Sequence, residues 1–343
     1  MSWRFAEQSA DHLLPLGVTE RMPEGQRVAA GDVIASGTTY GSPVRLAGAR
    51  RLGVTPDDLG RVLRVAPGAE IERGAIIART GRRFARAVTA PVDGRIAHVR
   101  ADGDLELAPV VERWSLRATL DGIVTASTDS LVTVEGAAWT LQGVAAYGRD
   151  AVGELALSVS GPADELQPSR IDVRLRDRIL IGGGRSGAEA ITRAHACGVA
   201  AVVTGAVPAA GLRVVFGEDA SARSTSLRGD VPTVLCLVGF GGAQLPPAIF
   251  APLAALAGAR AAIHTASARL FVFAAPNAIE AARVIPSLAL VADWGAVRSL
   301  DGPAAQAGEV TFASEVVAPA VRVSDGPMPA ANVRAFDAPR GGP

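Results

Sequence analysis

A glycine-rich turn has residue types and a spacing suited to binding a phosphate group. The run from Gly182 to Gly187 reads Gly-Gly-Gly-Arg-Ser-Gly and fits the pattern Gly-x-Gly-x-x-Gly, between a strand predicted at 178–181 and a helix predicted at 187–197. Glycines in such a turn let the backbone approach a pyrophosphate, and the helix N-terminus offers free amide groups and a partial positive charge. The candidate binding residues are Gly182, Gly184, Arg185, Ser186 and Gly187.

A second glycine-rich turn follows the strand predicted at 231–238 and adds Gly239 and Gly241 as candidates. In a parallel sheet both turns would emerge at the carboxyl ends of strands, where open α/β sheets bind ligands. The sequence around the first turn is similar to flavin and nicotinamide oxidoreductases. However, the acid expected about twenty residues later is missing, because residues 202–206 read Val-Val-Thr-Gly-Ala. A nucleotide or flavin site and a turn whose glycines serve only packing both remain open.

All 34 basic side chains of this 343-residue chain are arginine, and there is no lysine. This excludes biotin, lipoate and pyridoxal phosphate attached through lysine, and it excludes a Walker A loop. Arginine cannot replace the lysine amine as a nucleophile, although it binds carboxylates and phosphates in a bidentate way. High alanine, glycine and arginine contents are also typical of a GC-rich bacterial genome, which would explain the absence of lysine without a functional cause.

The N-terminal third repeats itself. The glycine-framed run that begins at Gly25 recurs at Gly68 with an offset of 43 positions, and residues 90–96 recur in similar form at 118–124. Short β-branched runs separated by Gly, Asp-Gly and Pro-Gly predict strands joined by tight turns.

The segment from Gly68 to Leu107 resembles the biotinyl/lipoyl attachment family, through the run Gly-x-x-Ile-x-x-Gly-x-x-Ile and the later Ala-Pro-Val-Asp-Gly-Arg-Ile. The resemblance implies a small flattened barrel of hairpins built as two similar halves. It places Arg83 where the family carries the modified lysine, so it implies an unmodified barrel-sandwich module.

Four arginines, Arg79, Arg82, Arg83 and Arg86, surround Phe84 at the predicted hairpin tip. They predict either a solvated hairpin that protects an exposed edge or a docking site for an acidic partner. Residues 45–100 hold twelve arginines against five acids, whereas residues 101–170 hold four against eleven. These opposed charges could pair within a monomer, between subunits or with a partner. Aromatic residues for base stacking are nearly absent there, so no nucleic-acid binding is expected.

Histidine and cysteine give no local sign of a metal or catalytic centre. His12, His98 and His264 are isolated in sequence, and His195 is expected on the buried side of its helix. No pair has metal-ligand spacing, and the two cysteines form no Cys-x-x-Cys motif. We therefore expect no metal site and no catalytic residues.

The N-terminus lacks the apolar core of a secretory signal, and glycines and prolines interrupt the uncharged run at 231–259. We therefore expect a cytoplasmic protein without a transmembrane segment. The expected fold class is a multi-domain β plus α/β chain. Its parts are a barrel-sandwich-like β domain (1–110), a β extension (111–160), a linker (161–169), a small, mostly parallel three-layer α/β domain (170–294), and a β appendage with a flexible tail (295–343).

These features favour a non-catalytic binding or assembly module, a structural or accessory subunit that docks on protein partners or self-associates. The alternative is a nucleotide- or phosphate-binding protein or an oxidoreductase that uses the turn at Gly182 to Gly187. A third interpretation, from analogy with barrel-sandwich domains in membrane-associated electron-transfer or export assemblies, rests on fold likeness alone.

Overall fold

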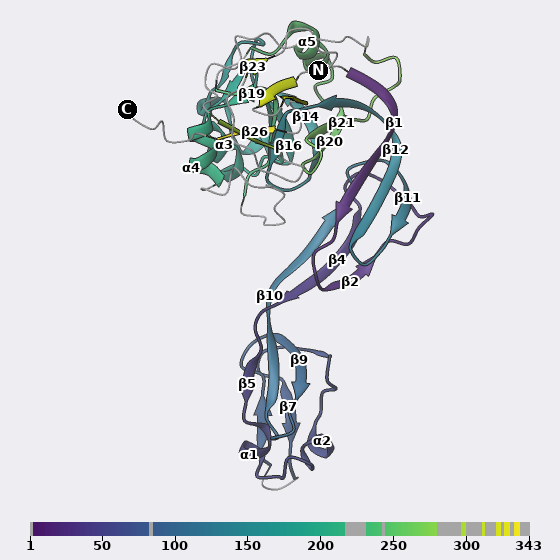
Figure 1. Ribbon diagram of the computed structural model, residues 1–343, viewed down its shortest axis with the longest axis vertical. Helices are drawn as coiled ribbons and strands as arrows, with labels where there is room; N and C mark the ends of the chain where they lie inside the picture. The colour runs from purple at the N-terminus through teal and green to yellow at the C-terminus, as the bar shows by residue number, and fades with distance from the viewer. Residues whose placement is uncertain are drawn as a thin grey trace. The chain divides into compact units, whose positions relative to one another are not determined.

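The computed structural model describes residues 3–81, 85–216, 231–241 and 244–279, and five short strands between 296 and 336 (Figure 1). The short strands are β22 (Ala296–Ser299), β23 (Thr311–Phe312), β24 (Ala320–Val323), β25 (Gly326–Pro329) and β26 (Val333–Phe336). Several expected features lie outside the described residues: Arg82, Arg83, Phe84, Gly242, the strand at 287–292, most of the helix before it, and the tail at 338–343.

The strand-rich chain forms two compact units that are both discontinuous in sequence. Unit 1 contains Met1–His12, Met22–Ile34 and Arg117–Pro343, and unit 2 contains Leu13–Arg21 and Ala35–Leu116. The sequence pattern instead predicts domains that follow one another along the chain. Local patterns indicate where strands lie, but they do not indicate which distant strands pair, so they miss a division of this kind.

Unit 1 contains a large mixed sheet, to which thirteen strands of the described chain belong. The central strands β14, β16, β18 and β19 run parallel. The neighbouring β20 and β21 pair antiparallel, because only four residues connect them and a parallel crossover needs a dozen or more. The sheet is therefore mixed rather than mostly parallel. Its longer strands are β1 (Trp3–Leu13), β11 (Gly122–Ser127), β12 (Leu131–Gln142), β14 (Ala151–Leu157), β16 (Arg178–Ile181), β18 (Ala201–Val207), β19 (Val234–Phe240), β20 (Arg260–His264) and β21 (Arg269–Val272), and its shorter ones are β3 (Arg27–Val28), β13 (Ala145–Tyr147), β15 (Glu165–Leu166) and β17 (Arg185–Ser186).

In the described part of unit 1, three α-helices accompany this sheet: α3 (Ala188–Ala196), α4 (Ala209–Phe216) and α5 (Pro247–Ala255). Helix α3 buries Ala190, Ile191 and Ala194 and ends before Gly198, whose φ of 75° stops the helix. The uncharged run at 231–259 contains β19 and α5, as predicted. Within the described part of the chain, no helix is long and apolar enough to cross a membrane.

The core of unit 1 is apolar along most of the strands that form it. Ile179, Leu180 and Ile181 of β16 are fully buried, and so are their neighbours on β18 and β19. Trp139 and Tyr147 lie in the interior, and both cysteines are buried and free. Continuous burial of a strand on both faces is typical of the parallel part of a sheet.

Unit 2 contains a six-stranded sheet, a separate hairpin and two short helices. Its core is formed by small and medium aliphatic side chains, among them Leu59, Ile77, Ile96 and Leu105, all fully buried. The sheet contains β2 (Val18–Arg21), β4 (Val33–Tyr40), β5 (Val44–Leu46), β6 (Glu70–Ile71), β9 (Gly94–Val99) and β10 (Leu105–Arg117); the hairpin is β7 (Ile76–Arg79) with β8 (Ala87–Thr89), and the helices are α1 (Gly48–Leu52) and α2 (Leu59–Val62).

The repeats of the sequence fold alike, down to single hydrogen bonds. The Gly25 amide donates to the Val124 carbonyl at 2.8 Å, and in the second copy the Gly68 amide donates to the Ile96 carbonyl at 2.7 Å. Both glycines have positive φ, 81° and 89°. The first copy is assembled in unit 1 from segments near 25 and 118, and the second in unit 2 from segments near 68 and 90. The second copy is thus inserted in sequence between the two halves of the first.

An aspartate fixes the same turn in each copy. Asp121 Oδ1 accepts a hydrogen bond from the Ala30 amide at 2.7 Å. Asp93 Oδ1 accepts one from the Arg73 amide, 43 positions further along, also at 2.7 Å. The Asp-Gly pairs that the sequence marked as turns therefore hold the two segments of each copy together.

Candidate functional site

The glycine turn at 182–187 lies between β16 and α3, as predicted, but its first three residues are buried. The Gly182 amide donates to the Val203 carbonyl at 2.8 Å, and the Gly184 amide donates to the Asp164 carbonyl at 2.9 Å. A phosphate-binding turn must direct such amides at its ligand. Here these two amides are already engaged by the backbone.

Close backbone contacts explain why glycine occupies this turn. Gly183 has a φ of 68°, and a Cβ atom there would lie 2.5 Å from the Asp164 carbonyl oxygen. On β18, a Cβ atom on Gly205 would lie 2.7 Å from the Gly184 carbonyl oxygen. The absence of side chains therefore lets three backbone segments pack together.

The N-terminus of α3 faces a carboxylate of the same chain. A Cβ atom on Gly187, the residue before the helix, would lie 3.5 Å from Glu165 Oε1. The same oxygen lies 3.7 Å from Arg185 Nε. Gly211 of α4 lies beside the same end of α3, because a Cβ atom on Gly211 would lie 3.5 Å from the Ala188 nitrogen.

Glu165 comes from the run 161–169, which was expected to be a linker and is instead packed structure. Its β15 pairs in parallel with β17, and Leu166 is 1% exposed. Ser186 Oγ, a candidate ligand atom, is buried and would lie 2.7 Å from a Cβ on Gly182, so it faces the preceding turn.

The second turn lies on the other side of β18. Gly239 is paired with Ala206, and the Gly241 amide donates to the Val207 carbonyl at 3.0 Å. The two glycine turns therefore flank the carboxyl end of one strand, as the parallel arrangement predicted. Gly239 and Gly241 are both buried, and Gly241 has a positive φ of 89°.

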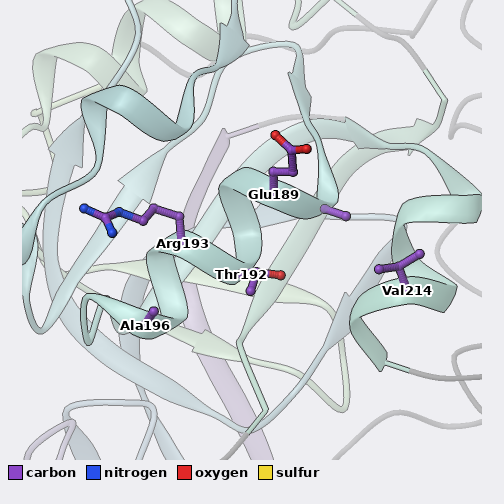
Figure 2. Close-up of a pocket in the computed structure, with 6 residues that line it drawn as sticks. Glu189, Thr192, Arg193, Ala196 and Val214 are labelled. Atoms are coloured by element: carbon purple, nitrogen blue, oxygen red, sulfur yellow. The ribbon is translucent and has the colours of Figure 1, made fainter.

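A shallow groove of about 430 Å³ lies between α3 and α4 (Figure 2). Figure 2 shows Glu189 and Arg193 on successive turns of α3 pointing to different sides, with Val214 opposite them on α4. His195, expected on the buried side of α3, is partly exposed. The lining residues are Ala188, Glu189, Thr192, Arg193, Ala196 and Val214.

Arg79 and Arg86, the two described members of the predicted arginine cluster, lie in unit 2 at the β7–β8 hairpin. The Thr80 amide donates to the Arg86 carbonyl at 2.9 Å, which closes the hairpin beside Arg79. Helix α1, which carries Arg50 and Arg51, ends beside this hairpin. A Cβ atom built on Gly53, the residue after α1, would lie 2.6 Å from the Arg86 guanidinium.

The segment that carries Arg64 lies beside the same hairpin, because the Arg64 amide donates to the Ile77 carbonyl at 2.8 Å. We call the five exposed arginines on or beside this hairpin the arginine end: Arg50, Arg51, Arg64, Arg79 and Arg86. The sequence identified only Arg79 and Arg86 among them, because the other three lie 12 or more positions before the hairpin.

Three arginines elsewhere in unit 2 pair with acids. Arg45 lies 2.9 Å from Asp102, and Arg61 lies 2.8 Å from Asp58. Arg100 pairs with Glu106 at 3.0 Å, and that contact, with Asp102 nearby, raises the pKa of its guanidinium. Among the described residues, the guanidinium groups of the arginine end have no such carboxylate partner.

Sequence reasoning missed a cluster in unit 1 that contains two of the histidines. His12 Nδ1 lies 3.1 Å from Asp150 Oδ2, and the ring of His264 lies 5.1 Å from that of His12 in an edge-to-face arrangement. More than a hundred positions separate each of these residues from the next. No spacing rule could therefore have joined them.

Comparison with protein families, curated proteins and solved structures finds no match to this chain.

Proposed function

We propose that this chain is a non-catalytic docking module, a structural or accessory subunit whose arginine end binds an acidic surface of another protein. The observation that carries the proposal is that five exposed arginines without carboxylate partners among the described residues come from segments on or beside one hairpin. Guanidinium groups bind carboxylates in a planar, bidentate way and remain charged at all physiological pH values.

The distribution of charge supports this proposal. Unit 2 contains fourteen arginines and ten acids, whereas unit 1 contains twenty arginines and twenty-four acids. A basic unit on a neutral chain gives a dipolar charge distribution, which steers an acidic partner toward one part of the molecule. Arginine is also enriched in protein interfaces relative to lysine.

The proposed fold of the docking unit is an unmodified barrel-sandwich. The glycine turn with its capping aspartate Asp93 lies in this unit and supports such a fold, and the related turn with Asp121 lies in unit 1. Unit 1 would then provide a three-layer α/β domain. No biotin or lipoate chemistry is proposed, because the chain has no lysine to carry either group.

The alternative, a nucleotide or flavin site at Gly182 to Gly187, has less support. The amides of Gly182 and Gly184 are engaged, and the Glu165 carboxylate lies where a phosphate would meet the helix. A carboxylate at that place would repel a phosphate. The glycines are instead explained by close packing.

A binding titration with a defined acidic probe tests the docking proposal. Fluorescently labelled poly-L-glutamate of fixed length is titrated with the full chain at low and at physiological salt, and anisotropy is recorded. We expect binding that weakens as salt increases, and a loss of at least tenfold in affinity in the variant Arg50→Glu, Arg51→Glu, Arg64→Glu. These residues are exposed, so the fold should survive.

The matched control reverses exposed arginines elsewhere in unit 2, in the variant Arg73→Glu, Arg95→Glu, Arg113→Glu. The proposal fails if this control loses as much affinity as the test variant, or if a DNA duplex of equal charge binds more tightly than the acidic polypeptide. Sedimentation equilibrium measures self-association of the wild type and the variants. If only the test variant loses self-association, the arginine end binds a second copy of this chain, and the proposal of a different partner protein is overturned.

A further inference from the structure

Three side chains from distant segments meet in unit 1: His12 near the end of β1, Asp150 just before β14, and His264 at the end of β20. One ligand atom from each lies within 4.8 Å of the others. The two histidines are 2% and 3% exposed, and the Asp150 side chain is 16% exposed. The cluster is therefore nearly enclosed and reaches solvent at the carboxylate.

Neighbouring groups hold the outer atoms of all three side chains. Asp150 Oδ1 accepts hydrogen bonds from the Thr265 amide and hydroxyl, both at 2.8 Å. His264 Nε2 lies 3.1 Å from the Asp11 carbonyl oxygen, and because a carbonyl only accepts, Nε2 carries the proton. His12 Nε2 lies 3.4 Å from Thr119 Oγ1. Metal-binding histidines are held in this way through their second nitrogen.

The remaining donor atoms of the three side chains are His12 Nδ1, Asp150 Oδ2 and His264 Nδ1. A proton on Nε2 of His264 leaves the lone pair on Nδ1, where the Ser267 hydroxyl lies at 2.7 Å. His12 Nδ1 and Asp150 Oδ2 face each other at 3.1 Å. That separation is close to the distance of roughly 3 Å between two ligand atoms on one divalent ion with metal–ligand distances of about 2.1 Å.

The chemistry of the three side chains also suits a cation, because each offers a nitrogen or oxygen atom with a lone pair and one of them is a carboxylate.

We propose that His12, Asp150 and His264 bind a divalent transition metal ion, with zinc as the preferred metal. Two imidazoles and one carboxylate are a donor set that zinc uses, and it leaves a fourth position for water or for the Ser267 hydroxyl. The bound ion links β1 to the segments around β14 and β20. It therefore stabilises the N-terminal strand on the sheet of unit 1.

Cobalt titration of the full chain tests this site. The chain is stripped with a chelator, dialysed and titrated with Co²⁺ while visible absorption is recorded. We expect d–d bands that saturate at one ion per chain and disappear when Zn²⁺ is added. The variants His264→Gln and Asp150→Asn should bind Co²⁺ at least tenfold more weakly. The control variants His98→Gln and His195→Gln should bind like the wild type.

A second measurement on the wild type avoids relying on variants of buried residues, because these could fail to fold. In ¹⁵N-edited NMR spectra of the imidazole rings, one equivalent of Zn²⁺ should shift the Nδ1 signals of two of the four histidines and leave the other two unchanged. The proposal is overturned if no d–d band forms at equimolar cobalt, if folded His264→Gln binds like the controls, or if zinc moves no histidine signal. The cluster would then be a hydrogen-bonded core network only.

Discussion

The carboxylate of Glu165 lies 3.5 Å from the point where a side chain on Gly187 would begin, at the N-terminus of α3. Negative side chains stabilise this end of a helix, by about 0.3–1 kcal/mol at the surface. Because the acid belongs to the chain itself, the helix end is already compensated. This contact favours a packing role for the glycine turn over a ligand-binding role.

Replacing Gly183 by alanine should destabilise the chain by about 2 kcal/mol or more. The φ of 68° disfavours a side chain, and the Asp164 carbonyl oxygen lies 2.5 Å from the new Cβ atom. The measurement is the free energy of unfolding from urea denaturation. Gly187→Ala is the control, because its φ of −79° suits alanine and its nearest contact is 3.5 Å away, so we expect a change within about 0.5 kcal/mol. Equal effects in the two variants would contradict the packing explanation.

Removing the capping aspartate should have related effects in both copies of the repeat. Asp93→Ala should cost about 1 kcal/mol, because the Arg73 amide loses its acceptor. Asp121→Ala should cost more, because Asp121 Oδ1 also lies 2.9 Å from Arg260 Nη2. Thermal unfolding measures both. Since the two turns belong to different units, the double variant should show nearly additive losses, and Asp57→Ala, an exposed position outside both turns, should show none.

The local part of this fold was predictable because its causes are local. The glycines at 25 and 68 need positive φ, and the aspartates at 93 and 121 accept from nearby turns, so the same residues recur wherever the same turn recurs. The strand, glycine turn and helix at 178–197 were predictable for the same reason, since hydrophobic runs and glycine positions determine such units.

The candidate sites depended on pairing between distant segments, which residue spacing does not encode. Strand β20 pairs antiparallel with β14, and β21 pairs antiparallel with β12. This pairing places His264 of β20 beside Asp150 and His12, although each histidine is isolated in sequence. Two distant segments likewise engage amides of the glycine turn, Val203 of β18 that of Gly182 and Asp164 that of Gly184. In both cases the decisive partner comes from another strand or loop.

Tyr40 of unit 2 should ionise at a higher pH than an ordinary tyrosine. Burial raises the pKa of its phenol, and the hydrogen bond to Glu70 raises it further. Absorbance at 295 nm, taken as the difference between the wild type and Tyr40→Phe, isolates this group. Glu70→Gln should move the titration toward lower pH, whereas Glu72→Gln, two positions away and exposed, should leave it unchanged. A Tyr40 titration that does not respond to Glu70→Gln would contradict this coupling.

Acid should destabilise the metal-free chain through the histidine–aspartate cluster. Burial would raise the pKa of Asp150, but the contact with His12 and the nearby histidine charges bring it to about 2, below its ordinary 3.8; burial lowers the pKa of His264 below 6.5. For both groups the unfolded chain takes up protons at a higher pH than the folded chain. Their stabilisation is therefore complete above about pH 7 and is lost as the pH falls toward 2.

Urea unfolding of the chelator-treated chain at pH 7.5, 5.5 and 4.0 measures this loss of folding stability. Between pH 7 and pH 2, protonation of Asp150 should contribute about 2 kcal/mol to the loss. Asp150→Asn should lower stability at pH 7.5 and flatten the pH profile, because the amide does not titrate. Asp57→Asn, at an exposed position, should keep the wild-type profile. If Asp150→Asn and the wild type lose stability in parallel on acidification, the cluster does not determine the acid response of the fold.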